Sequence, residues 1–146
     1  MTLYTQLILL AVMIIVSAFS AMSETALLSL SKFKARHWVE KKKFGSIYVK
    51  KLKDSPEILL STLLITNNLV NTSAAVIATS IALQIFESNA IGIAIGVATF
   101  LILIFGDILP KSVGNNNNEI LAPIVAPIVW NLSIAIYPLT RALEYF

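Results

Sequence analysis

Long apolar segments dominate this chain and decide its class. Residues 3–30 contain one charged side chain, Glu24, and residues 58–86 contain none. Each run exceeds the roughly 20 residues that an α-helix needs to cross about 30 Å of hydrocarbon. A third apolar segment occupies residues 90–109. The sequence therefore predicts an all-α integral membrane protein.

The composition supports this class and excludes others. Hydrophobic residues make up 57% of the chain and charged residues 13%, about half of the roughly 25% found in globular proteins. A soluble domain of this size cannot bury so much apolar surface, which excludes an ordinary soluble enzyme, a nucleic-acid-binding module and a disordered chain. With no Cys and one His, His37, thiolate sites and His clusters are excluded as well. No catalytic constellation is visible, so we do not expect an enzyme.

We expect three transmembrane helices, in residues 1–31, 56–87 and 90–111. The short connection between the second and the third makes them antiparallel neighbours. A fourth apolar segment, within residues 119–146, is long enough to cross but carries Pro123, Pro127 and Pro138. Proline removes a helical hydrogen bond unless it lies in a first turn. Hydropathy alone leaves this segment open between a fourth span and an interfacial or re-entrant segment.

Positive charge is concentrated in residues 32–54, which hold nine of the eleven Lys and Arg residues, against Glu40 and Asp54, for a net charge of +7. By the positive-inside rule this loop is cytoplasmic and the N-terminus is outside. Apolar residues alternate with the charges, which predicts two amphipathic helices at the inner interface, broken at Gly45. The basic run is either a topology signal with a solvated face or a surface for anionic lipid headgroups; no nucleic-acid partner is expected.

Polar side chains inside the spans need a partner or a function. Ser17, Ser20 and Glu24 share one helical face, because steps of three and four residues bring side chains together. Asn67 and Asn71 are one such step apart in the second span. The alternative is structural: small Ser residues allow close packing, and Asn pairs form hydrogen bonds between helices.

The end of the third span frees a backbone oxygen. Pro110 has no N–H for the carbonyl of Gly106, four residues back, and in hydrocarbon that oxygen must find a positive partner. The adjacent Asp107 is a carboxylate within the span. The alternative for it is an ion pair with Lys111 at i,i+4.

Together the three spans offer hydroxyl, amide, carbonyl and carboxylate oxygens in the cytoplasmic half. An all-oxygen shell suits a hard cation, namely Mg²⁺, Ca²⁺ or Na⁺. The residues alone therefore indicate a membrane domain that handles cations.

Three motifs carry a resemblance to a known family: SAFSAMSETALLSLS (residues 17–31), LLSTLLITNNLVN (59–71) and GDILPKSVG (106–114). In this order they resemble the transmembrane domain of the CNNM/CorC magnesium transporters, over nearly the whole chain. The resemblance implies three spans with juxtamembrane helices, a homodimer in the cell (plasma) membrane, and movement of Mg²⁺, with exchange for Na⁺ as one mode. It also implies that residues 119–146 lie at the inner leaflet, with Trp130 and Tyr137 as anchors. In that family a cytoplasmic CBS pair usually follows; none is present in these residues.

The same resemblance implies a ligand set. Together with the residue patterns above, the expected metal ligands are Ser17, Asn67, Asn71, Gly106 through its carbonyl, and Asp107, with Ser20 as a lesser candidate and with Pro110 and Lys111 supporting the site. Two departures from the family pattern are visible. The second Ser of the first motif falls on Ala21, with Ser20 one place earlier and about 100° away around the helix. The usual Glu of the third motif is Asp107, one methylene shorter.

Two rival functions remain at this stage. One is a Na⁺-selective carrier; the other is a membrane-anchored sensor or interaction module that transports nothing. In an anchor the polar groups should be satisfied by one another. In a transporter they should leave oxygens for an ion or its water.

Overall fold

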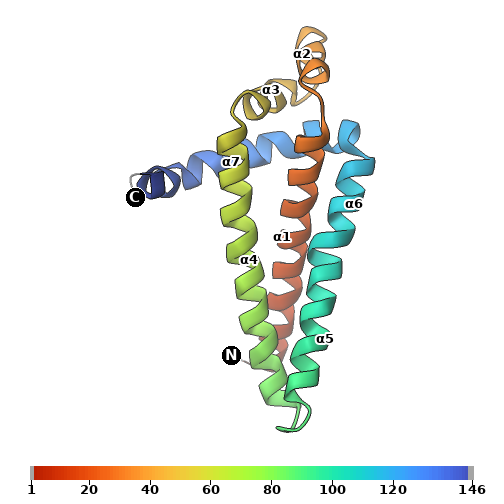
Figure 1. Ribbon diagram of the computed structural model, residues 1–146, viewed down its shortest axis with the longest axis vertical. Coiled ribbons are helices and arrows are strands. Elements are labelled where there is room, and N and C mark those ends of the chain that lie inside the picture. The colour runs from red at the N-terminus through yellow and green to blue at the C-terminus, as the bar shows by residue number, and fades with distance from the viewer. Residues whose placement is uncertain (1, 145–146) are drawn as a thin grey trace.

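The computed structural model describes residues 2–144, which form helices and contain no strand, so the predicted all-α class is confirmed. The elements are α1 (Leu3–Ser29), α2 (Lys32–Glu40), α3 (Ser46–Asp54), α4 (Pro56–Ile85), α5 (Ile91–Leu103), the π-helical turn η1 (Ile104–Ile108), α6 (Leu109–Asn116) and α7 (Asn118–Glu144). In Figure 1, α1, α4 and the continuous α5–α6 rod run along the long axis. Helix α7 runs across one end of this bundle, and α2 and α3 lie at the same end.

Helices α1 and α4 are antiparallel and share polar contacts at the end where α1 begins and α4 ends. Gln6, near the start of α1, donates from Nε2 to Ser80 Oγ at 2.8 Å, near the end of α4. Gln84 Nε2 in turn donates to Gln6 Oε1 at 2.6 Å. These amides satisfy one another, as polar groups between membrane helices generally must.

The apolar core lies at the opposite end, where α1, α2, α3, α4 and α7 meet. Leu27, Leu52 and Leu59 are buried there. Lys53 Nζ donates to the carbonyl of Leu27 at 3.0 Å and so caps the C-terminus of α1, where a cation is favoured. Burial, and secondarily the charge of Lys32, lowers the pKa of Lys53.

Within residues 2–144, four helices are long and apolar enough to cross a membrane: Leu3–Ser29, Pro56–Ile85, Ile91–Asn116 and Asn118–Leu139. The sequence predicts three spans, and the fourth candidate is α7, whose three Pro residues lie inside the helix. In Figure 1, α7 runs across the long axis of the molecule, whereas the other three helices run along it. The last two residues of the predicted segment 119–146 lie outside the described residues.

The third span extends further than its predicted end at Lys111, because the helix continues through Pro110 to Asn116. The Leu109 N–H bonds the Ile104 carbonyl, five residues back instead of four. This wider π-helical turn places Pro110 in the first turn of α6, where a missing N–H costs little. Single π-helical turns of this kind are frequent at functional sites.

Helix α6 packs directly on α1 through Gly114. A Cβ at Gly114 would overlap the carbonyl oxygen of Met22. The glycine is therefore required for the backbones to approach this closely.

Replacing Gly114 by Ala should reduce the free energy of unfolding by about 1–3 kcal/mol, because the added methyl overpacks the α1–α6 contact. Asn115→Ala is the control, since Asn115 is an exposed position of the same helix, and it should cause no loss. Denaturation midpoints in detergent compare the two. Equal midpoints would show that the close approach is not a constraint on the fold.

Candidate metal centre

Ser17 is the point at which three helices meet. It lies on α1 and is 1% exposed. Its Oγ is 2.6 Å from Asn71 Oδ1 on α4 and 3.0 Å from the Gly106 carbonyl oxygen in η1. A Cβ at Gly106 would lie 3.2 Å from Ser17 Oγ, so the glycine gives its backbone room to approach. Three oxygens from three helices therefore converge on one position.

One proton serves this cluster. A serine hydroxyl carries a single hydrogen, so Ser17 cannot give a full hydrogen bond to Asn71 Oδ1 and to the Gly106 carbonyl at the same time. Two acceptors compete for one donor. A cation bound among the three oxygens would satisfy all of them, since hard cations take hydroxyl, amide and carbonyl ligands.

Ser20 on α1 and Asn67 on α4 each lie about one helical turn from this cluster. Asn67 Nδ2 donates to Glu24 Oε2 at 3.3 Å. Ser20 Oγ and Asn67 Oδ1 are buried and have no hydrogen-bond partner within residues 2–144. Leaving such an atom unpaired costs about 1–3 kcal/mol, and each case calls for an explanation such as a bound water or ion. These two oxygens are available to a ligand.

Asp107 does not join these oxygens. Its side chain is 35% exposed, and its Oδ1 lies 3.4 Å from Lys111 Nζ, the i,i+4 ion pair that the sequence offers as the alternative. A carboxylate paired in this way has part of its charge neutralised. Asp107 can become a ligand to the cluster only if it leaves Lys111.

The structure thus divides the predicted ligand set. It brings Ser17, Asn71 and the Gly106 carbonyl together, leaves Ser20 and Asn67 with unpaired oxygens one turn away, and pairs Asp107 with Lys111. The part of the chain that the structure describes holds no group of three or more His, Cys, Asp or Glu side chains suited to a metal. The candidate centre is therefore built mainly from neutral oxygens.

Glu24 is the residue that the predicted ligand set misses. It is the carboxylate in contact with Asn67. The sequence carries a signal for it, because Glu24 is the one charged residue in the first apolar run and lies four residues after Ser20. That spacing places it on the same helical face.

The CNNM family, described as the cyclin M transmembrane N-terminal domain, matches residues 8–146. The chain belongs to this family. A UPF0053 protein of Haemophilus influenzae is 38% identical over 142 residues, which cover 97% of the chain and 34% of the relative. The UPF0053 inner membrane protein YfjD of Escherichia coli is 33% identical over 129 residues, which cover 81% of the chain and 30% of the relative.

A chloroplastic DUF21 domain-containing protein of Arabidopsis thaliana is 35% identical over 139 residues, which cover 94% of the chain and 21% of the relative. This CNNM domain therefore spans about a third or less of the length of these relatives. The match assigns it to a family of membrane proteins. It agrees with the apolar helices described above.

Ser17→Ala should destabilise the CNNM domain by about 1–2 kcal/mol in metal-free buffer, because it leaves two facing acceptors without a donor. Ser23→Ala is the control: Ser23 is equally buried but donates to the Phe19 carbonyl of its own helix, so its loss should cost less than about 0.5 kcal/mol. Unfolding midpoints in detergent with a chelator test the difference. If the two variants lose equal stability, the Ser17 hydroxyl does not hold the helices together.

Proposed function

We propose that this CNNM domain transports Mg²⁺ across the membrane through the oxygen cluster around Ser17. One observation carries the proposal. The Ser17 hydroxyl lies within hydrogen-bond distance of two acceptors, Asn71 Oδ1 and the Gly106 carbonyl, but has one proton to donate. The unpaired oxygens of Ser20 and Asn67 support it. Family membership is consistent with it.

The ligand chemistry favours a hard ion that is released again. Mg²⁺ prefers six oxygens at about 2.0–2.1 Å and gives up its water reluctantly. In the proposed bound state, the main protein ligands are Ser17, Asn67, Asn71 and the Gly106 carbonyl. The hydroxyl of Ser20 and water molecules complete the shell. Asp107 adds charge when it leaves Lys111. Neutral ligands bind weakly enough for the ion to dissociate, which a carrier needs.

We further propose that α1, α4 and the α5–α6 rod span the plasma membrane while α7 lies along the inner leaflet. The net charge of +7 in residues 32–54 supports a cytoplasmic position for α2 and α3 and an external N-terminus. The crossing direction of α7 in Figure 1 supports its interfacial position.

The proposed assembly is a homodimer. Gly92 and Gly96 on α5 have the small-xxx-small spacing that lets membrane helices pair closely, and a Cβ at either would meet nothing within 4 Å. A second copy of the chain would cover this face.

Two alternatives predict different behaviour. A Na⁺-selective carrier would use the same oxygens, and Na⁺ is also the proposed coupling ion, so Na⁺ must be compared with Mg²⁺ in the same assay. A membrane-anchored sensor would use these side chains only to pack helices. The unpaired oxygens of Ser20 and Asn67 argue against packing alone.

Flux of Mg²⁺ into proteoliposomes tests the proposal. Asn67→Ala and Asn71→Ala should each reduce Mg²⁺ flux at least tenfold, because each removes a ligand oxygen. Asn68→Ala is the matched control, since Asn68 is an exposed neighbour on another face of α4, and should retain the parent rate. Size-exclusion profiles confirm that the variants are folded and assembled.

The contrary outcomes are distinct. Parent-like flux in both variants would make the two asparagines packing residues. Flux of Na⁺ without Mg²⁺ would favour the Na⁺ carrier. A parent chain without ion flux would contradict the proposal that this domain transports ions.

A further inference from the structure

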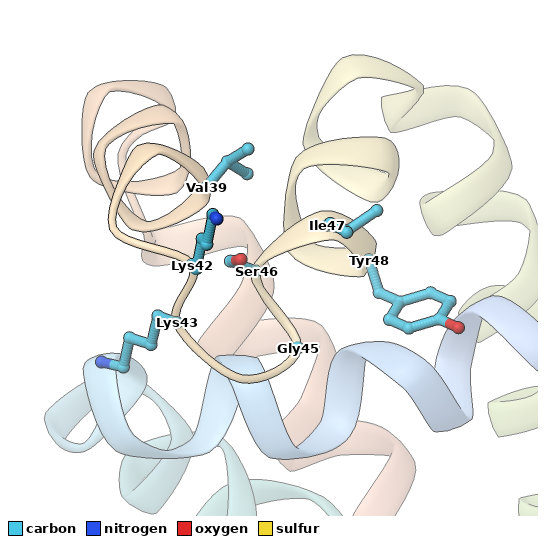
Figure 2. A pocket seen from close by; sticks show the side chains of 7 residues that line it. All are labelled: Val39, Lys42, Lys43, Gly45, Ser46, Ile47 and Tyr48. Carbon is cyan, nitrogen blue, oxygen red and sulfur yellow. The ribbon is translucent and has the colours of Figure 1, made fainter.

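The turn between α2 and α3 encloses a cavity of about 420 Å³, lined by residues that include Val39, Lys42, Ser46, Ile47 and Tyr48 (Figure 2). It lies at the end of the bundle where α7 crosses, away from the oxygen cluster around Ser17. We propose that this cavity binds the phosphate of an anionic phospholipid headgroup.

The N-terminus of α3 supplies backbone donors. Gly45, at the N-cap with φ +72°, offers no capping side chain, and the first turn carries no acidic residue. The Ser46 and Val49 N–H groups bond the Lys43 and Gly45 carbonyls. The N–H groups of Ile47 and Tyr48 have no acceptor among residues 2–144. Unpaired amides at a helix N-terminus attract phosphate oxygens, and the helix dipole adds to the attraction.

Ser46 gives an independent indication of a ligand. It is 2% exposed, yet its hydroxyl forms no hydrogen bond within the described part of the chain. Ser46 lies at the start of α3 and lines the cavity (Figure 2). There, a bound group can accept the hydrogen bond of its hydroxyl. Ser46 can donate to a phosphate oxygen.

Lys42 supplies the charge. It lines the same cavity as Ser46 (Figure 2), and it has no carboxylate partner in residues 2–144. The neighbouring Lys43 is differently engaged, with Nζ 3.9 Å from the centre of the Trp38 ring. A lysine ammonium forms charge-assisted hydrogen bonds with phosphate. Lys42, Ser46 and two backbone amides therefore make a mixed donor set for one anion.

The surroundings favour a lipid over a free phosphate ion. Val39 and Ile47 give the cavity apolar walls, which suit glycerol and acyl carbons. Phe33 on α2 is 85% exposed, and Phe44 in the turn between α2 and α3 is 77% exposed. Such side chains beside a basic surface are typical of helices that lie at a membrane interface.

Binding of phosphatidylglycerol to the purified chain, followed by native mass spectrometry and by thermal stabilisation in detergent, tests the site. We expect at least tenfold preference over phosphatidylcholine. Lys42→Gln and Ser46→Ala should each weaken phosphatidylglycerol binding by roughly fivefold, the order expected from losing one charged or hydroxyl contact. Lys50→Gln removes the same charge from an exposed position of α3 outside the cavity and should weaken binding less than twofold.

Each contrary result is decisive. Equal weakening in Lys42→Gln and Lys50→Gln would mean that only the overall positive charge attracts lipid. Parent-like binding of phosphatidylglycerol by Ser46→Ala would contradict the proposal that the phosphate binds in this cavity. Stabilisation of the lipid-free chain by millimolar inorganic phosphate, lost in the same two variants, would make the ligand a soluble phosphate and overturn the lipid assignment. Lipid-free unfolding midpoints equal to that of the parent show that both variants fold.

Discussion

The hydrogen-bond requirement of oxygens buried between membrane helices is the constraint on which this structure depends. Ser17 has one proton and faces two acceptors, Asn71 Oδ1 and the Gly106 carbonyl. The surrounding backbone makes this meeting possible. The π-helical turn of Ile104–Ile108 carries the Gly106 carbonyl, and Gly114 lets α6 pack on the backbone of α1.

The same atoms serve packing and, in the proposed function, ion binding. Without an ion, the Ser17 hydroxyl holds α4 and η1 to α1. Both nearby carboxylates are engaged: Glu24 accepts from Asn67, and Asp107 pairs with Lys111. A site that keeps its charges in other contacts binds a divalent ion weakly. Release of these two contacts would strengthen it, which gives a carrier two states of different affinity.

Sequence patterns that act within one helix were sufficient to predict much of this arrangement. The uncharged run 58–86 predicts a long helix, and α4 is one. The i,i+4 spacing of Asn67 and Asn71 predicts a shared face, and both meet residues of α1. Gly45 predicts the break between α2 and α3 because it can adopt a positive φ, as it does.

Features set by contacts between helices were not predictable in this way. Pro110 indicates a disturbed helix, but the π-helical turn that lets the helix continue depends on packing against α1. The i,i+4 spacing alone does not decide whether Asp107 pairs with Lys111 or contacts the oxygen cluster around Ser17. Hydropathy counts α7 as a candidate span, whereas its direction follows from its contacts with α1, α3 and α4.

The central claim is that a hard cation takes the place of the Ser17 hydrogen bonds, with the Gly106 carbonyl as a ligand. Mn²⁺ substitutes for Mg²⁺ at oxygen sites, and the chain has only five Gly residues to label with ¹³C at the carbonyl. Electron–nuclear double resonance of Mn²⁺ bound to this labelled chain should show one strongly coupled ¹³C nucleus, which disappears in Gly106→Ala because the label is lost. Bound Mn²⁺ with no strongly coupled carbonyl carbon would contradict the account.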